Sequence, residues 1–342
     1  MFLNLVMIKN FNCPICNNNS WGKIGEITYK IEEHQKDGKY FDDNYTKLRR
    51  RILFNKWFPG IKEIKFHSQY CFICGFACYS PRPENEDIEI KYNFLQKHEP
   101  YVGALTSKSK KSIYLDHKRS NNIFKRITRN GFSQDKIILD IGGGDGRHLL
   151  PFYKNNYKCY LIDYNKYPVE GIIRLGSTIE DIPYDLKFDC IMFNLVLSHI
   201  AEPIPFLKKI LNKLNDSGIC YVEVPLNFCV DILWDPVANI NYFTKTSLIN
   251  TLRSSGFDIM HIKKTIVGFG KSKKLIIWAL IKKSHSESNP IISGKKEIEE
   301  LISPSYIMII KRRFYEIRTK NSIKPLFRLI KQIFRKIINT LK

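Results

Sequence analysis

Four glycines lie within five consecutive positions of the segment KIILDIGGGDGRHLL, residues 136–150. They are Gly142, Gly143, Gly144 and Gly146, in a chain of 342 residues that has only 18 glycines. An apolar strand that runs into glycines and then into a helix presents backbone N–H groups and a helix N-terminus to a ligand. The cluster therefore predicts a ligand that lies against the backbone.

Two aspartates end consecutive apolar runs around this loop. Asp140 comes just before the glycines, and the next run, YKCYLID, ends in Asp163. A carboxylate at the end of a second strand is placed to bind ribose hydroxyls. The G-x-G-x-G spacing differs from the G-x-G-x-x-G of dinucleotide-binding proteins and disfavours a pyrophosphate cradle. A structural turn with surface acids is the alternative interpretation.

Two cysteine pairs have the spacing of metal ligands. The segment CPIC holds Cys13 and Cys16, and CFICG holds Cys71 and Cys74. Each C-x-x-C pair can place two thiolates on one ion, and four thiolates make a closed structural Zn²⁺ site. Cys78 is a spare thiol that could substitute, and two unrelated pairs of buried cysteines are the alternative. The other cysteines are interpreted as small apolar residues in or beside strands: Cys159, Cys190, Cys220 and Cys229.

Short apolar runs alternate with helical patterns from residue 136 to about residue 283. The runs are KIILDI, YKCYLID, FDCIMFNLV, GICYVEVP and KKLIIWALI. Strands separated by helices in this way predict a parallel α/β sheet. SPRPENED and SHSESNP have the composition of linkers. We expect a small zinc-ribbon-like module over residues 1–85, an α/β domain over 86–285 and a basic helical tail over 286–342.

From about residue 120 to residue 280 the chain resembles the class I S-adenosylmethionine-dependent methyltransferases. ILDIGGGDG is similar to the family's first motif, a hydrophobic strand that ends in acid-x-G-x-G-x-G. GSTIEDIP, FDCIMFNLVLSHI, PIPFLKKILNKLNDSGICYVEVP and NYFTKTSLINTLRSSGFDI follow in the family's order. The resemblance implies an S-adenosylmethionine cofactor and a Rossmann-like sheet with helices on both faces. The methyl group of that cofactor is already activated, so such a protein mainly aligns the acceptor and excludes water.

The resemblance also assigns cofactor contacts. Asp140 would help to hold the amino-acid end of the cofactor through the loop, and Asp163 would hold the ribose. Thr178 stands where the family often has an Asp next to adenine, which leaves backbone groups to recognise that base. The cofactor-binding residues are then expected to be Asp140, Gly142, Gly144, Gly146, Asp163, Thr178, Ile179 and Asn194.

Three residues are candidates for a catalytic role. FNLVLSHI lacks the Asn/Asp-Pro-Pro-aromatic motif of nucleobase-amine methyltransferases and resembles the corresponding segment of small-molecule and sugar methyltransferases. His199 is then the leading candidate base, since imidazole titrates near neutral pH; a structural histidine is the alternative. Glu223 ends a strand beside the expected cleft, and Tyr242 is a hydrogen-bonding alternative.

The acceptor class follows from the same resemblance. A double C-x-x-C module ahead of such a domain resembles sugar C-methyltransferases and related enzymes of glycan pathways. We therefore expect methyl transfer to a sugar, a glycan precursor or a related small molecule, with or without a linked nucleotide. Two alternatives stay open. One is a nucleic-acid (RNA) methyltransferase, and the other is a non-catalytic binding protein, indicated by the departures at Thr178, Ser198 and Asn239.

Net charge and the tail suggest an anionic partner. The formal net charge is +22, which favours phosphorylated metabolites, a lipid surface or nucleic acid. KPLFRLIKQIFRKIINTLK places apolar residues from Leu326 to Leu341 on one helical face. Such a helix suits an anionic membrane surface, and packing on the enzyme is the alternative. No apolar run has the length of a signal peptide or a membrane span, so we expect a cytoplasmic protein, peripherally bound to membrane if the tail binds lipid.

Overall fold

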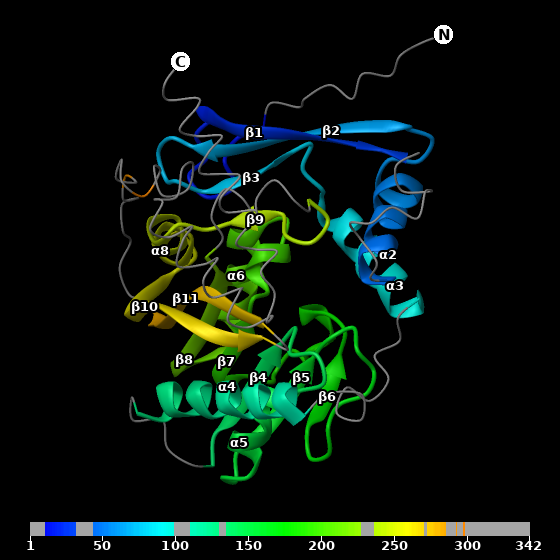
Figure 1. The fold of residues 1–342 in the computed structure, drawn as a ribbon. Coiled ribbons are helices and arrows are strands. Elements are labelled where there is room, and N and C mark those ends of the chain that lie inside the picture. Colours follow the sequence, from blue (N-terminus) through cyan, green and yellow to red (C-terminus); the bar gives the residue numbers. More distant parts are fainter. Residues whose placement is uncertain are drawn as a thin grey trace.

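The computed structural model describes residues 11–31, 44–98, 110–129, 135–226, 236–269 and 272–284, together with residues 292 and 297. Two β-sheets organise these residues, one of seven strands and one of four (Figure 1). None of the described helices is long and apolar enough to cross a bilayer. Nearly all of the expected tail, and Cys229, lie outside the described residues.

The seven-stranded sheet has the order β10-β11-β8-β7-β4-β5-β6. Five of its strands are parallel, and β11 pairs antiparallel with both β8 and β10. The strands are β4 (Ile137–Ile141), β5 (Lys158–Ile162), β6 (Ile173–Gly176), β7 (Phe188–Asn194), β8 (Leu214–Pro225), β10 (Phe257–Phe269) and β11 (Ser272–Lys283). The expected parallel-rich α/β sheet is confirmed.

Helices cover both faces of this sheet because successive strand residues point to opposite sides. Ile138 belongs to the hydrophobic cluster that contains Ile123 of helix α4 (Lys110–Thr128). Leu139 belongs to the other cluster, which contains Leu207 of helix α6 (Pro203–Lys213) and Leu248 of helix α8 (Lys245–Ser254). The near-continuous apolar runs of the sequence thus reflect burial on both faces. Short helix α5 (Leu150–Tyr153) follows the glycine loop.

The N-terminal residues form the four-stranded sheet β1-β2-β3-β9. Strands β1 (Trp21–Lys30), β2 (Glu63–Cys71) and β3 (Ala77–Ser80) come from the first part of the chain, whereas β9 (Asn241–Tyr242) comes from far along it. Between β1 and β2 the structure describes α2 (Asn44–Ile52) and the single turn η1 (Leu53–Trp57).

The N-terminal sheet and the large sheet share hydrophobic contacts. Phe76 packs on Phe243 with ring centroids 5.5 Å apart, and both lie in the cluster that contains Leu139 of β4. Helix α3 (Asn85–His98) then leads from β3 down to the carboxyl end of the large sheet (Figure 1). The N-terminal residues are therefore placed to contribute to a site on the large sheet.

Candidate active site

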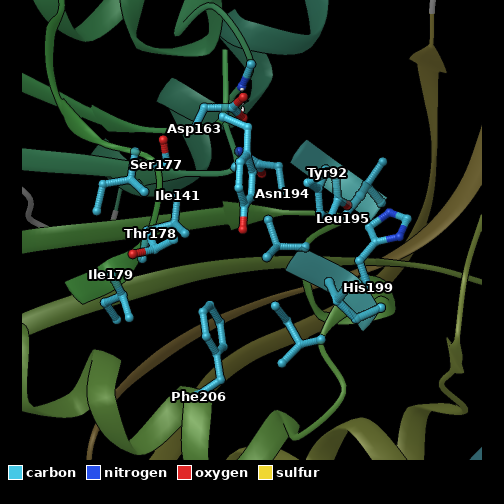
Figure 2. A pocket seen from close by; sticks show the side chains of 18 of the residues that line it. Tyr92, Ile141, Asp163, Ser177, Thr178, Ile179, Asn194, Leu195, His199 and Phe206 are labelled. Carbon is cyan, nitrogen blue, oxygen red and sulfur yellow. Dashed lines mark hydrogen bonds between the residues drawn. The ribbon is translucent and has the colours of Figure 1, made fainter. Parts of the chain in front are cut away.

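A cavity of about 770 Å³ lies at the carboxyl ends of β4, β5, β6 and β7. The loops after these strands line it with residues 141–145, 162–164, 177–180 and 194–196, and helix α3 lines it with Asn85, Ile88, Glu89 and Tyr92. Strand order reverses between β4 and β7, and ligands of open α/β sheets bind at such a switch point. In Figure 2, Tyr92 and His199 lie across the cavity from Thr178 and Ile179.

The glycine loop forms the wall after β4. Gly142, Gly144 and Gly146 have φ values of +66°, +67° and +77°, which L side chains rarely adopt. A Cβ atom on Gly144 would meet nothing within 4 Å, so it would project into open cavity space. Gly142 and Gly144 line the cavity, whereas Gly146 lies just beyond it and begins the next helical turn.

Asp163 ties the end of β5 to this loop. Its Oδ2 accepts a hydrogen bond from the Gly144 backbone N–H at 2.8 Å, and its Oδ1 accepts one from the Asn165 backbone N–H at 2.7 Å. Burial raises the pKa of Asp163, although these two hydrogen bonds oppose the rise. Each carboxylate oxygen has a second lone pair, so Asp163 can both shape the loop and accept a ligand hydroxyl.

Two acceptor atoms near the switch point have no hydrogen-bond partner among the described residues. They are Asp140 Oδ2 and Asn194 Oδ1, both shielded from solvent. Asn194 Nδ2 donates to the other Asp140 oxygen at 3.4 Å. Asp140 lies behind the loop: a Cβ on Gly143 would come within 2.3 Å of its Oδ2. Buried polar atoms are normally satisfied, so these acceptors fit a ligand with cationic N–H donors, such as the amino-acid end of S-adenosylmethionine.

The affinity for S-adenosylmethionine is expected to rise with pH. Burial, followed by repulsion from Asp163, raises the pKa of Asp140 well above its usual value. A cationic ligand favours the ionised carboxyl, so binding must displace a proton below that raised pKa, and the affinity levels off above it. The slope is at most about tenfold per pH unit for one proton. Calorimetry across a pH series measures it, and Asp140→Asn should flatten the slope; equal slopes would contradict this role.

The same shift lowers the stability of the ligand-free protein as pH rises. Asp140 binds its proton more tightly in the folded than in the unfolded state. Its contribution to the free energy of unfolding is therefore fully present below its usual pKa of 3.8 and is lost as pH rises through the raised pKa. The two effects have opposite signs, because the ligand favours the carboxylate that burial disfavours.

The loop after β6 presents Thr178 and Ile179 to the cavity. Asp181 accepts hydrogen bonds from the backbone N–H groups of Ser177 and Thr178 at 2.7 and 2.9 Å, and Thr178 caps the short helix η3 (Ile179–Asp181). Both N–H groups are therefore occupied within the loop. The expected contact of this segment with adenine stays a prediction.

An aromatic pair that the sequence reasoning missed lines the cavity beside Asp163. Tyr92 of α3 stacks on Tyr164 with centroids 5.0 Å apart and planes 8° apart. The Gln96 side chain, also on α3, donates to the Tyr164 backbone carbonyl. The position of Tyr164 directly after the ribose aspartate was an available signal. Tyr92 gave none, because its approach depends on how α3 packs.

His199 is the one proposed catalytic residue that lines the cavity. It ends the single 3₁₀ turn η4 (Leu197–His199) that follows β7. Its ring stands edge-on to Tyr92, with centroids 6.4 Å apart and planes 86° apart. The imidazole thus lies between the switch point and α3.

Glu223 does not lie where the sequence suggested. Strand β8 continues to Pro225, so Glu223 is inside the strand, paired with Asn194 and Trp278, and is fully buried. Its carboxylate contacts the guanidinium groups of Arg119 and Arg126 and accepts a hydrogen bond from the Tyr221 hydroxyl at 2.6 Å. It is not among the described cavity-lining residues. This carboxylate compensates the buried cation of Arg119 and the partly buried cation of Arg126.

Replacing Glu223 with alanine is expected to lower the free energy of unfolding by about 3–5 kcal/mol, because it removes the carboxylate partner of the buried Arg119 and of the partly buried Arg126. Urea unfolding of the wild type and Glu223→Ala measures the difference. Asp185→Ala is the control, since Asp185 is an exposed carboxylate. A stable Glu223→Ala protein would contradict the structural role and return Glu223 to the catalytic candidates.

Tyr242 also lies away from the cavity. It pairs with Ala77 in the N-terminal sheet, is 2% exposed and packs on Tyr79 with centroids 5.8 Å apart. Residues 241 and 242 form a strand of the N-terminal sheet, so the Tyr242 side chain packs in the hydrophobic cluster of that sheet. Tyr242 is therefore not placed to contact an acceptor in the described cavity.

The four expected metal ligands come together. The Sγ atoms of Cys13, Cys16, Cys71 and Cys74 all lie within 4.8 Å of one another. The Cys13–Cys74 and Cys16–Cys71 separations are 3.6 and 3.5 Å. A tetrahedral ion with Zn–S bonds of about 2.3 Å requires S···S separations of about 3.8 Å. The thiol set fits one Zn²⁺ ion.

The two cysteine knuckles have matching backbones. The Asn17 N–H donates to the Cys13 carbonyl, and the Gly75 N–H donates to the Cys71 carbonyl. The residue after each second cysteine is left-handed, with φ of +57° at Asn17 and +70° at Gly75. Cys78 is outside the cluster. The two cysteine pairs therefore lie in turns of the same backbone geometry.

Part of the chain is similar to known methyltransferases. Residues 115–262 match the family model of a methyltransferase domain. A tRNA U34 carboxymethyltransferase of Dichelobacter nodosus is 23% identical over 189 residues, which are 51% of this chain and 60% of that protein. The alignment thus spans less than two thirds of the relative.

Two solved methyltransferases are similar to this chain at low sequence identity. A 1,6-didemethyltoxoflavin-N1-methyltransferase of Burkholderia thailandensis is 15% identical, with 59% of this chain and 91% of that chain covered and a TM-score of 0.45. A magnesium protoporphyrin IX methyltransferase of Synechocystis PCC 6803 is 12% identical, with 56% and 97% covered and a TM-score of 0.42.

The family match lies over the strands and loops that build the cavity, from α4 into β10. Within it are the glycine loop, Asp163 and His199. The chain therefore carries a methyltransferase domain over residues 115–262 and is an enzyme.

Proposed function

We propose that the protein transfers a methyl group from S-adenosylmethionine to a sugar, a glycan precursor or a related small molecule. One observation carries the proposal: a single cavity is lined by the glycine loop, Asp163, Asn194 with its unsatisfied Oδ1, and His199. The glycine loop, Asp163 and Asn194 would bind a cationic nucleoside, and His199 would contact the methyl acceptor beside it.

The residues have distinct roles in this proposal. S-adenosylmethionine, when bound, supplies an activated methyl group. Gly142 and Gly144 allow the backbone to approach the cofactor, and Asp163 holds the loop and accepts ribose hydroxyls. His199 accepts the proton of the acceptor hydroxyl as that oxygen becomes a nucleophile. The Tyr92–Tyr164 stack closes the α3 side against water.

Charges around the cavity disfavour an acceptor phosphate inside it. Three described cations line the cavity, and each is paired: Arg119 with Glu223, Arg147 with Asp145 and Asp116, and Lys209 with Glu180. Glu89 and Glu202 line it without an ion pair to any described cation. Carboxylates accept hydrogen bonds from hydroxyl or ammonium groups and repel phosphate. The group that enters is therefore a neutral or cationic part of the acceptor.

Labelled methyl donor, incubated with the protein and a small-molecule cell extract, tests the proposal by mass spectrometry of the extract. A labelled glycan precursor or sugar would support it. A matched pair of probes, a free hexosamine and its nucleoside-diphosphate derivative, tests which part enters the cavity. We expect the nucleoside-diphosphate derivative to bind in the cavity no more tightly than the free hexosamine does. Tight binding of the derivative alone would contradict the exclusion of phosphate by the cavity's carboxylates.

RNA methylation is a second candidate. It is favoured by the net charge of +22 and by similarity to a protein named as a tRNA carboxymethyltransferase. The same labelling experiment with total RNA, with and without ribonuclease, decides between the classes. S-adenosylhomocysteine binding without transfer to either pool would instead favour a non-catalytic binding protein.

A structural Zn²⁺ on the four cysteines belongs to the same proposal, as do a cytoplasmic location and membrane contact through the tail. The tail from Leu326 to Leu341 lies outside the described residues. Sedimentation with vesicles that contain anionic lipid, with and without residues 322–342, tests its role, because such binding weakens as salt screens the charges.

A further inference from the structure

Arg82 joins the N-terminal residues to the turn that carries His199. It lies just after β3, and its guanidinium donates to the backbone carbonyl of Ala201 at 2.6 Å. It also donates to the carbonyl of Ile240 at 3.2 Å and to the side-chain oxygen of Asn241 at 2.7 Å. One side chain therefore links three points of the methyltransferase domain.

Asn241 extends this network around His199. Its Nδ2 donates to the carbonyls of Leu197 and Ile200, both at 2.7 Å. The Ile240 N–H donates to the Ser198 carbonyl at 2.9 Å. The carbonyls of residues 197, 198, 200 and 201 thus all accept hydrogen bonds from Arg82, Ile240 or Asn241. A shift of the turn would leave several of these groups unsatisfied, which is costly for buried polar groups.

The network reaches the cysteine cluster through β3. The Cys71 N–H donates to the Phe76 carbonyl at 2.8 Å, and β3 begins at the next residue. Cys78 of β3 pairs in register with Asn241, and the Arg82 guanidinium lies over the Phe76 ring at 5.7 Å. The second cysteine knuckle, β3, Arg82 and the His199 turn therefore form one continuous set of contacts.

We propose that Arg82 and Asn241 are positioning residues that fix the His199 turn, and that the four-cysteine centre supports them through β3. The consequence for methyl transfer rests on the proposed function, whereas the mechanical link does not. The N-terminal module then positions the acceptor side of the cavity, which is the His199 turn. Arg174 separately holds the cofactor side, which is formed by the loops after β5 and β6.

Arg174 provides a matched control. It also donates to backbone carbonyls, those of Asp163 and Asn165, and to the Ser177 hydroxyl. It holds the loops on the cofactor side of the same cavity. Arg82→Gln and Arg174→Gln therefore each remove guanidinium hydrogen bonds to backbone carbonyls, the first on the His199 side of the cavity and the second on the Asp163 side.

Hydrogen exchange, read by mass spectrometry, tests the proposal on the full chain. Arg82→Gln should raise amide exchange in residues 196–201 on the order of tenfold, because it removes three hydrogen bonds. It should leave residues 137–146 and S-adenosylhomocysteine affinity unchanged. Arg174→Gln should leave residues 196–201 unchanged, raise exchange in residues 163–177 and lower the affinity for S-adenosylhomocysteine. Removal of metal with a chelator should also raise exchange in residues 196–201 before it affects residues 137–146.

The His199 imidazole gives a readout that a merely structural role would not move. Its NMR resonance, assigned by its loss in His199→Gln, should shift in Arg82→Gln and stay in place in Arg174→Gln. If Arg82→Gln does not fold, Arg82→Lys keeps the charge and should show the same pattern more weakly. Exchange that rises uniformly, or a resonance that does not shift in the folded variant, overturns the proposal. Because no acceptor is needed, this result is independent of whether sugar methylation is found.

Discussion

Gly144→Val is expected to weaken S-adenosylhomocysteine binding by about 100-fold or more, while the protein stays folded. Gly144 has φ of +67°, and its added side chain would project into the cavity without meeting the protein. Left-handed backbone costs a β-branched residue about 1–3 kcal/mol, and the side chain fills space that the ligand needs. Titration calorimetry measures the loss.

Gly60→Val separates backbone strain from the filled cavity. Gly60 has φ of +81°, and its added Cβ would also meet nothing within 4 Å. It lies in the turn before β2, away from the described cavity-lining residues. Gly60→Val should therefore lose a similar amount of stability and keep wild-type affinity. If Gly144→Val binds as well as Gly60→Val does, the glycine loop does not hold the cofactor.

The cofactor side of the site could be predicted from sequence because its signals are local. The turn directly after an apolar strand requires the left-handed glycine, and Asp163 directly follows the next strand along the chain. The carboxyl ends of parallel neighbours meet at one edge of a sheet, so these residues converge whatever the rest of the fold does.

The acceptor side could not be predicted in this way. Whether Glu223 faces a cleft depends on where β8 ends and on two arginines that approach from α4 and are more than ninety residues away in sequence. Tyr92 reaches the cavity only because α3 packs across it. No periodicity in a single segment encodes such contacts, since each is decided by the packing of elements distant in the chain.

The N-terminal module shows the same division. The cysteine spacing predicted that four thiols would cluster, because each knuckle sets its own pair. It could not show that β9 would complete the module's sheet from residues 241 and 242. A two-residue strand carries no recognisable pattern of its own, so the link between the module and His199 became visible only in the folded chain.

Cys71→Ser is expected to abolish binding of one Zn²⁺ per chain and to lower the melting temperature on the order of 10 °C. Cys71 is fully buried, and its Sγ lies 3.5 Å from that of Cys16. A hydroxyl replaces a thiolate poorly as a zinc ligand, and three remaining thiolates leave the site incomplete. Elemental analysis and thermal unfolding measure the two losses on the same preparation.

Cys78→Ser distinguishes loss of metal from loss of a buried thiol. Cys78 is also fully buried, but it lies outside the four-cysteine cluster, and burial raises its pKa to about 11. A thiol that stays protonated at neutral pH packs as a small apolar group and need not bind metal. Cys78→Ser should therefore keep one zinc per chain and lose less stability than Cys71→Ser. Equal metal content in the two variants would exclude the proposed ligand set, because the cluster then would not need Cys71.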